Sequence, residues 1–222
     1  MKKHITLEVI KNDRTVKAFL QKADDHMKAI GYTEHGFRHA NIVAKAAADI
    51  LGKLGYHKRM VELASIAGYL HDIGNVVGRY DHGQVSALIA KDILMDLGMD
   101  PAEVAIVIGA IGNHEEPEAD PINAVCAALI LADKADVHLS RVRNLRMIAF
   151  DIHDRVNYAA KRSFIKVDRK AKTIALILQI DTKISQVMEY FEIFLSRMII
   201  SRRAANFLKC DFNLIINKVK LL

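Results

Sequence analysis

Three stretches of this chain carry apolar residues at helical spacing, and each stretch continues into a histidine or an aspartate. An ionisable side chain on the buried face of a helix is costly unless it is paired or binds a metal. The three stripes therefore predict helices whose inward polar groups meet at one site. They consist of His39, Val43, Ala46, Ile50 and Leu54; of Met60, Ala64, Ala67 and His71; and of Val125, Leu129 and Asp133.

Further helices are predicted in the first 140 residues from their apolar faces and their end signals. Residues 13–30 and 83–97 are each followed by a glycine, and Asp100 and Pro101 begin a helix that runs towards residue 113. A second Asp-Pro pair, at positions 120 and 121, is expected to begin the helix that carries Asp133. This pattern predicts a mainly α-helical fold.

A His-Asp doublet, His71 and Asp72, stands at the end of an apolar run. Adjacent helical residues point about 100° apart, so an apolar pattern cannot bury both side chains on one face. An imidazole and a carboxylate that enter a half-buried site together suit a divalent metal. The other residues of this kind, in chain order, are His39 before the doublet and His82, His114 and Asp133 after it.

This order of histidines and aspartates resembles the HD-domain superfamily of metal-dependent phosphohydrolases, over roughly residues 20–140. The resemblance implies an HD-type helical bundle and places His71, Asp72 and His114 in the catalytic centre. Four ligands can hold one metal, whereas six with a bridging Asp72 can hold a pair roughly 3.5–4 Å apart. The implied ligands are His39, His71, Asp72 and Asp133 at the core positions, with His82 and His114 as in the two-metal branches.

The ligand types bear on the metal, and the departures from the family bear on the substrate. Histidine and carboxylate ligands without thiolate favour Mn or Fe and permit Zn, Ni, Co or Mg. Many family members carry a lysine soon after the doublet, whereas this chain has Asn75 after Gly74. No Gly-Tyr-Pro tripeptide follows His114, which disfavours cyclic dinucleotides. We expect a nucleotide or another small phosphoester as the substrate.

Several polar residues near the predicted ligands have open alternatives. His35 is a further ligand, a group that supports the ligands, or a solvated residue, and Glu115 is a candidate to orient His114 or a water. A second doublet, His153 and Asp154, is interpreted as a structural or supporting element. Four cations are candidates to bind phosphate, although each also suits a solvated surface position: Arg38, Arg79, Lys134 and Arg141.

Composition and charge both change near residue 140. All 3 prolines and all 11 glycines lie at or before Pro121. Residues 1–140 hold 15 basic against 19 acidic side chains, whereas residues 141–222 hold 17 against 7. We therefore predict a metal-binding domain over residues 1–143 and a second domain over residues 144–222.

The second domain is predicted to be a small α+β unit. Residues 163–168 and 173–180 are expected to form a hairpin, followed by a helix over about 182–208 and a strand over 212–217. The helix would pack across a short antiparallel sheet. Its broad apolar face is equally consistent with a homodimer surface, and it comprises Val187, Met188, Phe191, Phe194, Leu195 and Met198.

The remaining sequence features bound the compartment and the function. The two cysteines, Cys126 and Cys210, form no CxxC motif, the start of the chain lacks the apolar core of a signal peptide, and no run is long enough to span a bilayer. We expect a cytoplasmic hydrolase without a membrane partner. The alternative is a regulatory or nucleic-acid-binding protein with a structural or vestigial metal centre. Nucleic acid is disfavoured because aromatic residues do not alternate with the basic ones of the tail.

Overall fold

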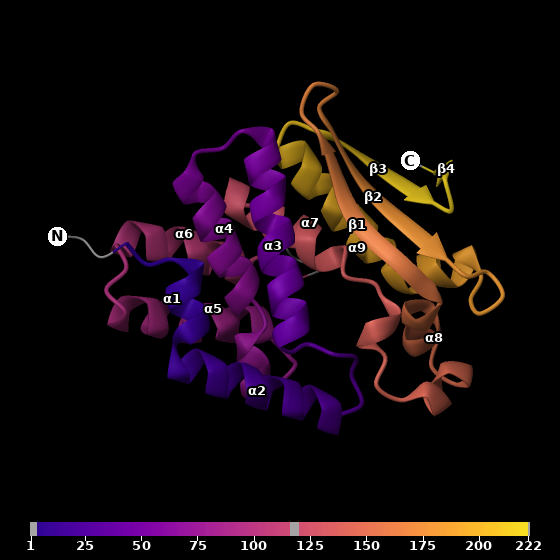
Figure 1. Ribbon diagram of the computed structural model, residues 1–222, viewed down its shortest axis with the longest axis horizontal. Helices are drawn as coiled ribbons and strands as arrows, with labels where there is room; N and C mark the ends of the chain where they lie inside the picture. Colours follow the sequence, from indigo (N-terminus) through magenta and orange to yellow (C-terminus); the bar gives the residue numbers. More distant parts are fainter. Residues whose placement is uncertain (1–3, 116–119, 222) are drawn as a thin grey trace.

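A bundle of helices forms the N-terminal part of the molecule, and a four-stranded sheet with one long helix completes it (Figure 1). This computed structural model describes residues 4–115 and 120–221. The predicted mainly α fold with a C-terminal α+β part is confirmed. The helices of the bundle are α1 (Leu7–Asn12), α2 (Arg14–Ala29), α3 (Phe37–Leu54), α4 (Lys58–Leu70), η1 (Ile73–Val76, a 3-10 helix), α5 (His82–Asp96), α6 (Pro101–Gly112) and α7 (Ala124–Lys134).

Helix α7 occupies the centre of the bundle, and its residues 125–132 are all buried. Helices α3, α4 and α6 pack around it, and a helix that is apolar on all sides suits such a position. Helix α4 crosses α3 so closely at Gly68 that a Cβ there would lie 2.8 Å from the Cα of Ala44. This approach brings His71, at the end of α4, next to His39 in the first turn of α3.

The predicted start of the helix that carries Asp133 is wrong. Helix α7 begins at Ala124, and Asn123 caps it by accepting a hydrogen bond from the Cys126 N–H at 2.8 Å. The Asn123 side chain also donates to the carbonyl oxygen of Ile106 in α6, at 3.3 Å. A contact with a distant helix therefore fixes this end, and the local Asp-Pro signal does not carry that information.

The C-terminal sheet is mixed, so the prediction of an antiparallel sheet is wrong. Strands β1 and β2 form the predicted antiparallel hairpin, but β3 pairs with β2 in parallel, with Phe212 opposite Ile174. Parallel neighbours need a crossover connection, which α9 supplies. The elements of this part are η2 (Leu139–Arg141), η3 (Leu145–Ala149), α8 (Ile152–Ala159), β1 (Ala160–Asp168), β2 (Thr173–Ile180), α9 (Val187–Phe207), β3 (Asp211–Ile216) and β4 (Val219–Lys220).

Helix α9 contacts both the sheet and the central helix α7. It begins at Val187, later than predicted, because Gln186 and Glu189 form a capping box there. Its buried face is narrower than predicted, since Met188 is 65% and Leu195 is 57% exposed. Buried residues of the bundle, of α9 and of the sheet form one continuous apolar core.

The division of the chain into domains at residue 143 stays a prediction. Among the described residues, no helix combines the length and the apolar character that crossing a bilayer requires.

Candidate metal centre

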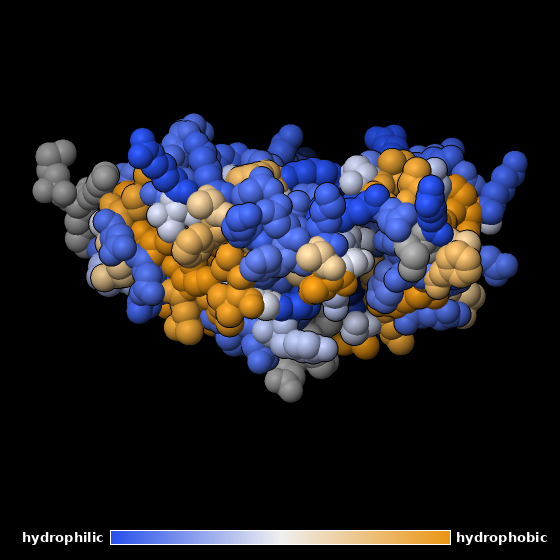
Figure 2. All heavy atoms as spheres, turned by 90° about the horizontal axis from the view of Figure 1, so that it is seen from below, coloured by the Kyte–Doolittle hydropathy of each residue, from blue (hydrophilic) through white to orange (hydrophobic). Residues whose placement is uncertain are grey.

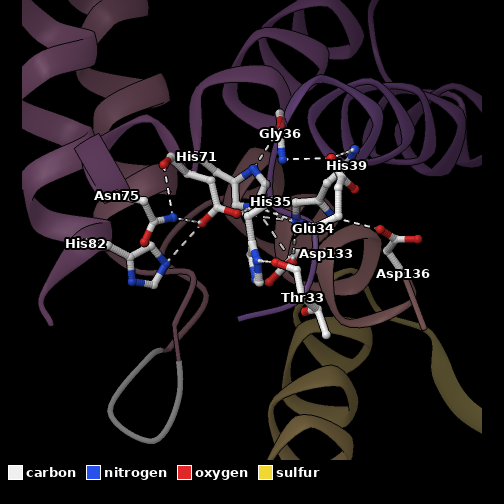
Figure 3. Close-up of polar contacts among 12 residues, drawn as sticks. Thr33, Glu34, His35, Gly36, His39, His71, Asn75, His82, Asp133 and Asp136 are labelled. Atoms are coloured by element: carbon white, nitrogen blue, oxygen red, sulfur yellow. Dashed lines mark hydrogen bonds and ion pairs between the residues drawn. The ribbon is translucent and has the colours of Figure 1, made fainter. Parts of the chain in front are cut away.

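Two histidines from the facing ends of α3 and α4 meet in the interior (Figure 3). The Nε2 atoms of His39 and His71 lie 3.2 Å apart, and both residues are 1% exposed. The other nitrogen of each ring has an acceptor. His39 Nδ1 donates to Asp136 Oδ2 at 2.7 Å, and His71 Nδ1 donates to the Gly68 carbonyl oxygen at 2.9 Å. With both Nδ1 atoms acting as donors, the Nε2 atoms of the two rings point into the same space, where each offers a lone pair whenever its ring is neutral.

Two carboxylates face the same space. Asp72 Oδ2 lies 3.5 Å from the Nε2 atoms of both His39 and His71. Asp133 Oδ1 lies 3.2 Å from the Nε2 atom of His39 and 3.7 Å from that of His71. Asp72 Oδ2 is buried and accepts no hydrogen bond from any described residue. Burial of such an oxygen is costly without a compensating partner.

His82 and His114 complete the cluster around Asp72. The second oxygen of Asp72, Oδ1, lies 3.2 Å from His82 Nε2. His114 Nδ1 donates to a main-chain carbonyl at 2.6 Å, which leaves its Nε2 as an acceptor. The structure thus brings all six predicted ligands together. They form three groups in which the ligand atoms lie within 4.8 Å of one another: His39, His71 and Asp72; His71, His114 and Asp133; and Asp72, His82 and His114.

The position of His82 depends on a close contact between η1 and α5. A Cβ on Gly74 would lie 2.5 Å from the carbonyl oxygen of His82 and from the N atom of Ser86. The Gly74 N–H donates to Ser86 Oγ at 2.7 Å. Asp81, just before α5, has a φ of 55°, a left-handed conformation that is uncommon outside glycine. The chain therefore turns tightly between η1 and α5, and the contact at Gly74 places His82 beside Asp72.

Carboxylates control the protonation of two histidines in the cluster. Burial lowers the pKa of His39 and of His82, but hydrogen-bonded carboxylates outweigh it and raise each pKa to about 9. Both rings are therefore doubly protonated and positively charged at neutral pH when no cation is bound. The carboxylates responsible are Asp133 and Asp136 for His39, and Asp72 and Glu115 for His82.

His114, Asp72 and Asp133 are held in the forms that bind metals. Burial and the neighbouring His71 keep the pKa of His114 well below its ordinary value, so this ring is neutral. Burial raises the pKa of Asp72, but His71 and His82 outweigh it and keep the pKa well below the usual range. Burial also raises the pKa of Asp133. The charge of Lys134, whose Nζ lies 2.8 Å from Asp133 Oδ2, outweighs this together with His39 and keeps the pKa well below the usual range. Neutral imidazoles and ionised carboxylates are the ligand forms of these side chains.

Asp136 is a polar residue of this site that the sequence did not reveal. It accepts from His39 Nδ1 (Figure 3). It also holds Arg38 in a two-pronged pair, with both N–O distances at 3.0 Å. It lies three residues beyond Asp133, on no apolar stripe, so no periodic pattern marked it. Asn75 was noted only as a departure from the family. Its Nδ2 donates to Asp72 Oδ1 at 3.0 Å and so supports that carboxylate.

The four predicted phosphate-binding cations lie in different surroundings. Arg38 pairs with Asp136, as described, and Lys134 is buried against Asp133. Arg79 Nη2 lies 3.1 Å from Glu115 Oε1. The other oxygen of Glu115 lies 2.7 Å from His82 Nδ1, so Glu115 contacts His82 rather than His114. Arg141 is 4% exposed. Their role in substrate binding stays a prediction.

Comparison with known proteins identifies relatives of this chain and the domain that contains the cluster. The uncharacterized protein MJ1020 of Methanocaldococcus jannaschii is 31% identical over 206 residues, which cover 82% of this chain and 79% of that protein. A model of the HD domain matches residues 36–138. This chain belongs to the HD-domain superfamily. All six clustered residues lie within the matched HD domain, and the similarity to MJ1020 extends beyond it.

Two further similarities each cover about half of this chain. Ribonuclease Y of Streptococcus agalactiae serotype III is 30% identical over 129 residues, which are 53% of this chain and 23% of that enzyme. A crystal structure described as a predicted HD superfamily hydrolase, from an uncultured Thermotogales bacterium, is 26% identical. It has a TM-score of 0.45 and covers 56% of this chain and 68% of its own.

Proposed function

We propose that this HD-domain protein is a metal-dependent phosphohydrolase that cleaves a nucleotide or another small phosphoester. One observation carries the proposal. The Nε2 atoms of His39 and His71 face each other at 3.2 Å, with an oxygen of Asp72 3.5 Å from each. Once His39 has lost its extra proton, the two rings and the ionised Asp72 present only lone pairs to one another, and a cation among them would remove the repulsion.

The residues of the cluster fit two divalent cations. The two oxygens of Asp72 face different histidines, Oδ2 towards His39 and His71 and Oδ1 towards His82, as a bridging carboxylate requires. Hydrogen bonds from each Nδ1 hold the rings of His39 and His71 in orientation, which is typical of metal-ligating histidines. Nitrogen and oxygen ligands without thiolate favour Mn or Fe and permit Zn, Ni, Co or Mg.

The chemistry expected of this site is attack of water on phosphorus. Bound cations would lower the pKa of a water molecule to near neutrality and offset negative charge on the phosphoryl oxygens. The protein's own cations, Lys134, Arg79 and Arg141, place further positive charge beside the cluster, where a phosphoryl group would lie. Asp136 keeps the His39 ring in a fixed orientation throughout.

Removal and return of metal tests the proposed function. Chelated protein is expected to lose hydrolysis of a generic phosphomonoester, and Mn²⁺ or Fe²⁺ is expected to restore it. Para-nitrophenyl phosphate, nucleoside monophosphates and RNA should be compared, since one relative is a ribonuclease. The Arg202→Ala variant, which alters an exposed residue of α9, serves as a control that retains activity. Metal-independent hydrolysis, or none with any metal, would contradict the proposal.

Metal binding is expected to release protons and to strengthen as the pH rises. His39 and His82 have pKa values raised to about 9 in the metal-free protein, so both are protonated at pH 7 and must each lose a proton to bind a cation. Apparent affinity should therefore increase with pH up to about 9 and level off above it. Calorimetric titration in buffers of different ionisation enthalpy measures the released protons. Affinity that is independent of pH between 6 and 9 would contradict this assignment.

The competing class is a regulatory or nucleic-acid-binding protein, which the basic C-terminal part suggests. Its arginines are partly engaged within the protein, since Arg155 pairs with Glu189 at 2.6 Å and Arg203 with Asp120 at 3.2 Å. Salt-sensitive RNA binding without hydrolysis of any phosphoester would favour this class over the hydrolase.

A further inference from the structure

The C-terminal sheet has one open face. Its other face packs against α9 and the bundle, and the β2 and β3 side chains on it are at most 7% exposed: Ile174, Leu176, Leu178, Ile180, Phe212, Leu214 and Ile216. Figure 1 shows α9 behind the strands. Successive side chains of a strand point to opposite faces, so the residues between the buried ones point outward. The outward-facing residues are Arg162, Phe164 and Lys166 on β1, Ala175, Ile177 and Gln179 on β2, and Asn213 and Ile215 on β3.

An apolar row crosses this open face. Phe164 pairs with Ile177, and Ile177 pairs with Ile215, so the three side chains lie side by side. Phe164 is 42% exposed, and the two isoleucines are half-buried. The three residues line a groove of about 530 Å³, which is within the range of ligand sites. An exposed ring beside aliphatic side chains offers a flat apolar surface on which a planar group can stack.

Basic side chains surround the row. Arg162 and Lys166 flank Phe164 on the same strand face, and the central carbon of the Arg162 guanidinium lies 5.8 Å from the centre of the Phe164 ring. Lys220 on β4 continues the row, Lys218 lines the groove, and all four basic side chains are exposed. Aromatic and basic residues do not alternate over the tail as a whole, but they do at positions 162, 164 and 166. The strand period places these three on one face.

The charge of the open face selects among the possible occupants. Its carboxylates, Asp168 and Asp211, both pair with Thr173, at the end of the sheet away from the groove. Asp168 also accepts from the Ala171 N–H at 2.9 Å, within the hairpin turn. A second copy would place one positive face against another, because a twofold dimer brings the same surface of both copies together. A polyanion has the complementary charge.

We propose that the open face of the sheet binds single-stranded RNA, with a base stacked on Phe164 and backbone phosphates beside Arg162 and Lys166. Four-stranded sheets with exposed aromatic residues bind RNA in this way, and stacking on a ring tolerates any base. A duplex keeps its bases stacked on one another, so only a single strand offers a base to the ring. The amides of Gln179 and Asn213 carry both donors and acceptors, as a 2′-hydroxyl requires, which favours RNA over DNA.

The proposed RNA contact uses no residue of the metal cluster, so it goes beyond the proposed hydrolysis and is tested separately. Fluorescence anisotropy with labelled oligouridine and oligoadenosine of about ten nucleotides measures binding. The same sequences as DNA, and the duplex of the two RNA strands, are the comparison probes. Both the parent protein and Asp72→Asn are titrated, because the variant is expected to leave the RNA uncleaved. RNA single strands are expected to bind more tightly than either comparison probe.

Two variants of the open face test the two kinds of contact. Phe164→Ala is expected to weaken RNA binding about 5- to 100-fold, the range for one stacked base, and to keep hydrolysis of para-nitrophenyl phosphate. The double variant Arg162→Gln with Lys166→Gln should also weaken binding. The slope of log affinity against log salt concentration should become shallower by about 1.4, since each lost phosphate contact removes about 0.7.

Matched controls come from helix α2. It runs along the lower edge of the molecule in Figure 1, on the face that Figure 2 shows, whereas the sheet lies at the upper right of Figure 1. Phe19→Ala removes a ring that is 36% exposed, similar to Phe164. Arg14→Gln with Lys17→Gln neutralises two exposed basic residues of α2. Neither control should change RNA affinity or its salt dependence.

The possible failures are distinguishable. The inference is overturned by absence of binding to single-stranded RNA, by DNA or duplex that binds as tightly, or by equal effects of Phe164→Ala and Phe19→Ala. A dimer that Phe164→Ala dissociates, without RNA binding, would assign the face to a second copy instead. Circular dichroism identifies a variant that fails to fold, and the remaining variant of the open face then decides. RNA binding that depends on Phe164, without metal-dependent hydrolysis of any phosphoester, supports this inference and refutes the proposed function.

Discussion

The Asp72→Asn variant is expected to lose metal and to hydrolyse phosphoesters at least roughly 10³-fold more slowly than the parent protein. Asp72 sends one oxygen towards His39 and His71 and the other towards His82. Asparagine keeps the shape of the side chain but lacks the negative charge, and its nitrogen cannot coordinate a cation. Both halves of the cluster should therefore be weakened by a single change.

Elemental analysis of the purified variant, together with steady-state kinetics, measures this effect. Asp49→Asn is the matched control, because it makes the same change on α3 at a side chain that is 52% exposed. The control should keep its metal content and rate. An Asp72→Asn protein that retains metal and more than about a tenth of the activity would falsify the bridging role.

Replacing Gly68 by alanine is expected to lower the free energy of unfolding by about 3 kcal/mol and to reduce metal affinity together with it. The added Cβ would lie 2.8 Å from both the Cα and the N of Ala44, which are backbone atoms that cannot turn aside. Helix α4 must then move away from α3, and His71 moves away from His39. The melting temperature should drop by roughly 5–10 °C.

Gly52→Ala, in the same helix pair, is expected to change the free energy of unfolding in the opposite direction. Gly52 lies in α3, and no atom lies within 4 Å of a Cβ built there. Alanine at this exposed helical position should raise stability by about 0.5–1 kcal/mol. Thermal unfolding of the two variants separates close packing from helix propensity. Equal effects of both substitutions would show that the contact at Gly68 is not the cause.

Local patterns in the sequence were sufficient for part of the metal cluster. His39, His71 and Asp133 each continue an apolar stripe, and a helical period of 3.6 residues makes a stripe visible without knowledge of the neighbouring helices. His82 and His114 lie at helix boundaries, where the family resemblance added what periodicity does not show. All of them meet at one place in the structure.

Contacts between distant segments were outside the reach of those patterns. Asp136 orients His39 across 97 positions of the chain, and Arg141 holds His35 across 106. The parallel pairing of β3 with β2 depends on the crossover through α9, not on the composition of either strand. For the same reason the start of α7 was misplaced, since its cap also bonds to α6.

The sequence by itself determined most of the helices, the C-terminal hairpin and the identity of the clustered residues, because periodicity and side-chain chemistry are properties of short segments. The tertiary structure alone decided that Asp136 orients His39 and that β3 pairs with β2 in parallel, because each of these contacts joins segments that are far apart in the chain.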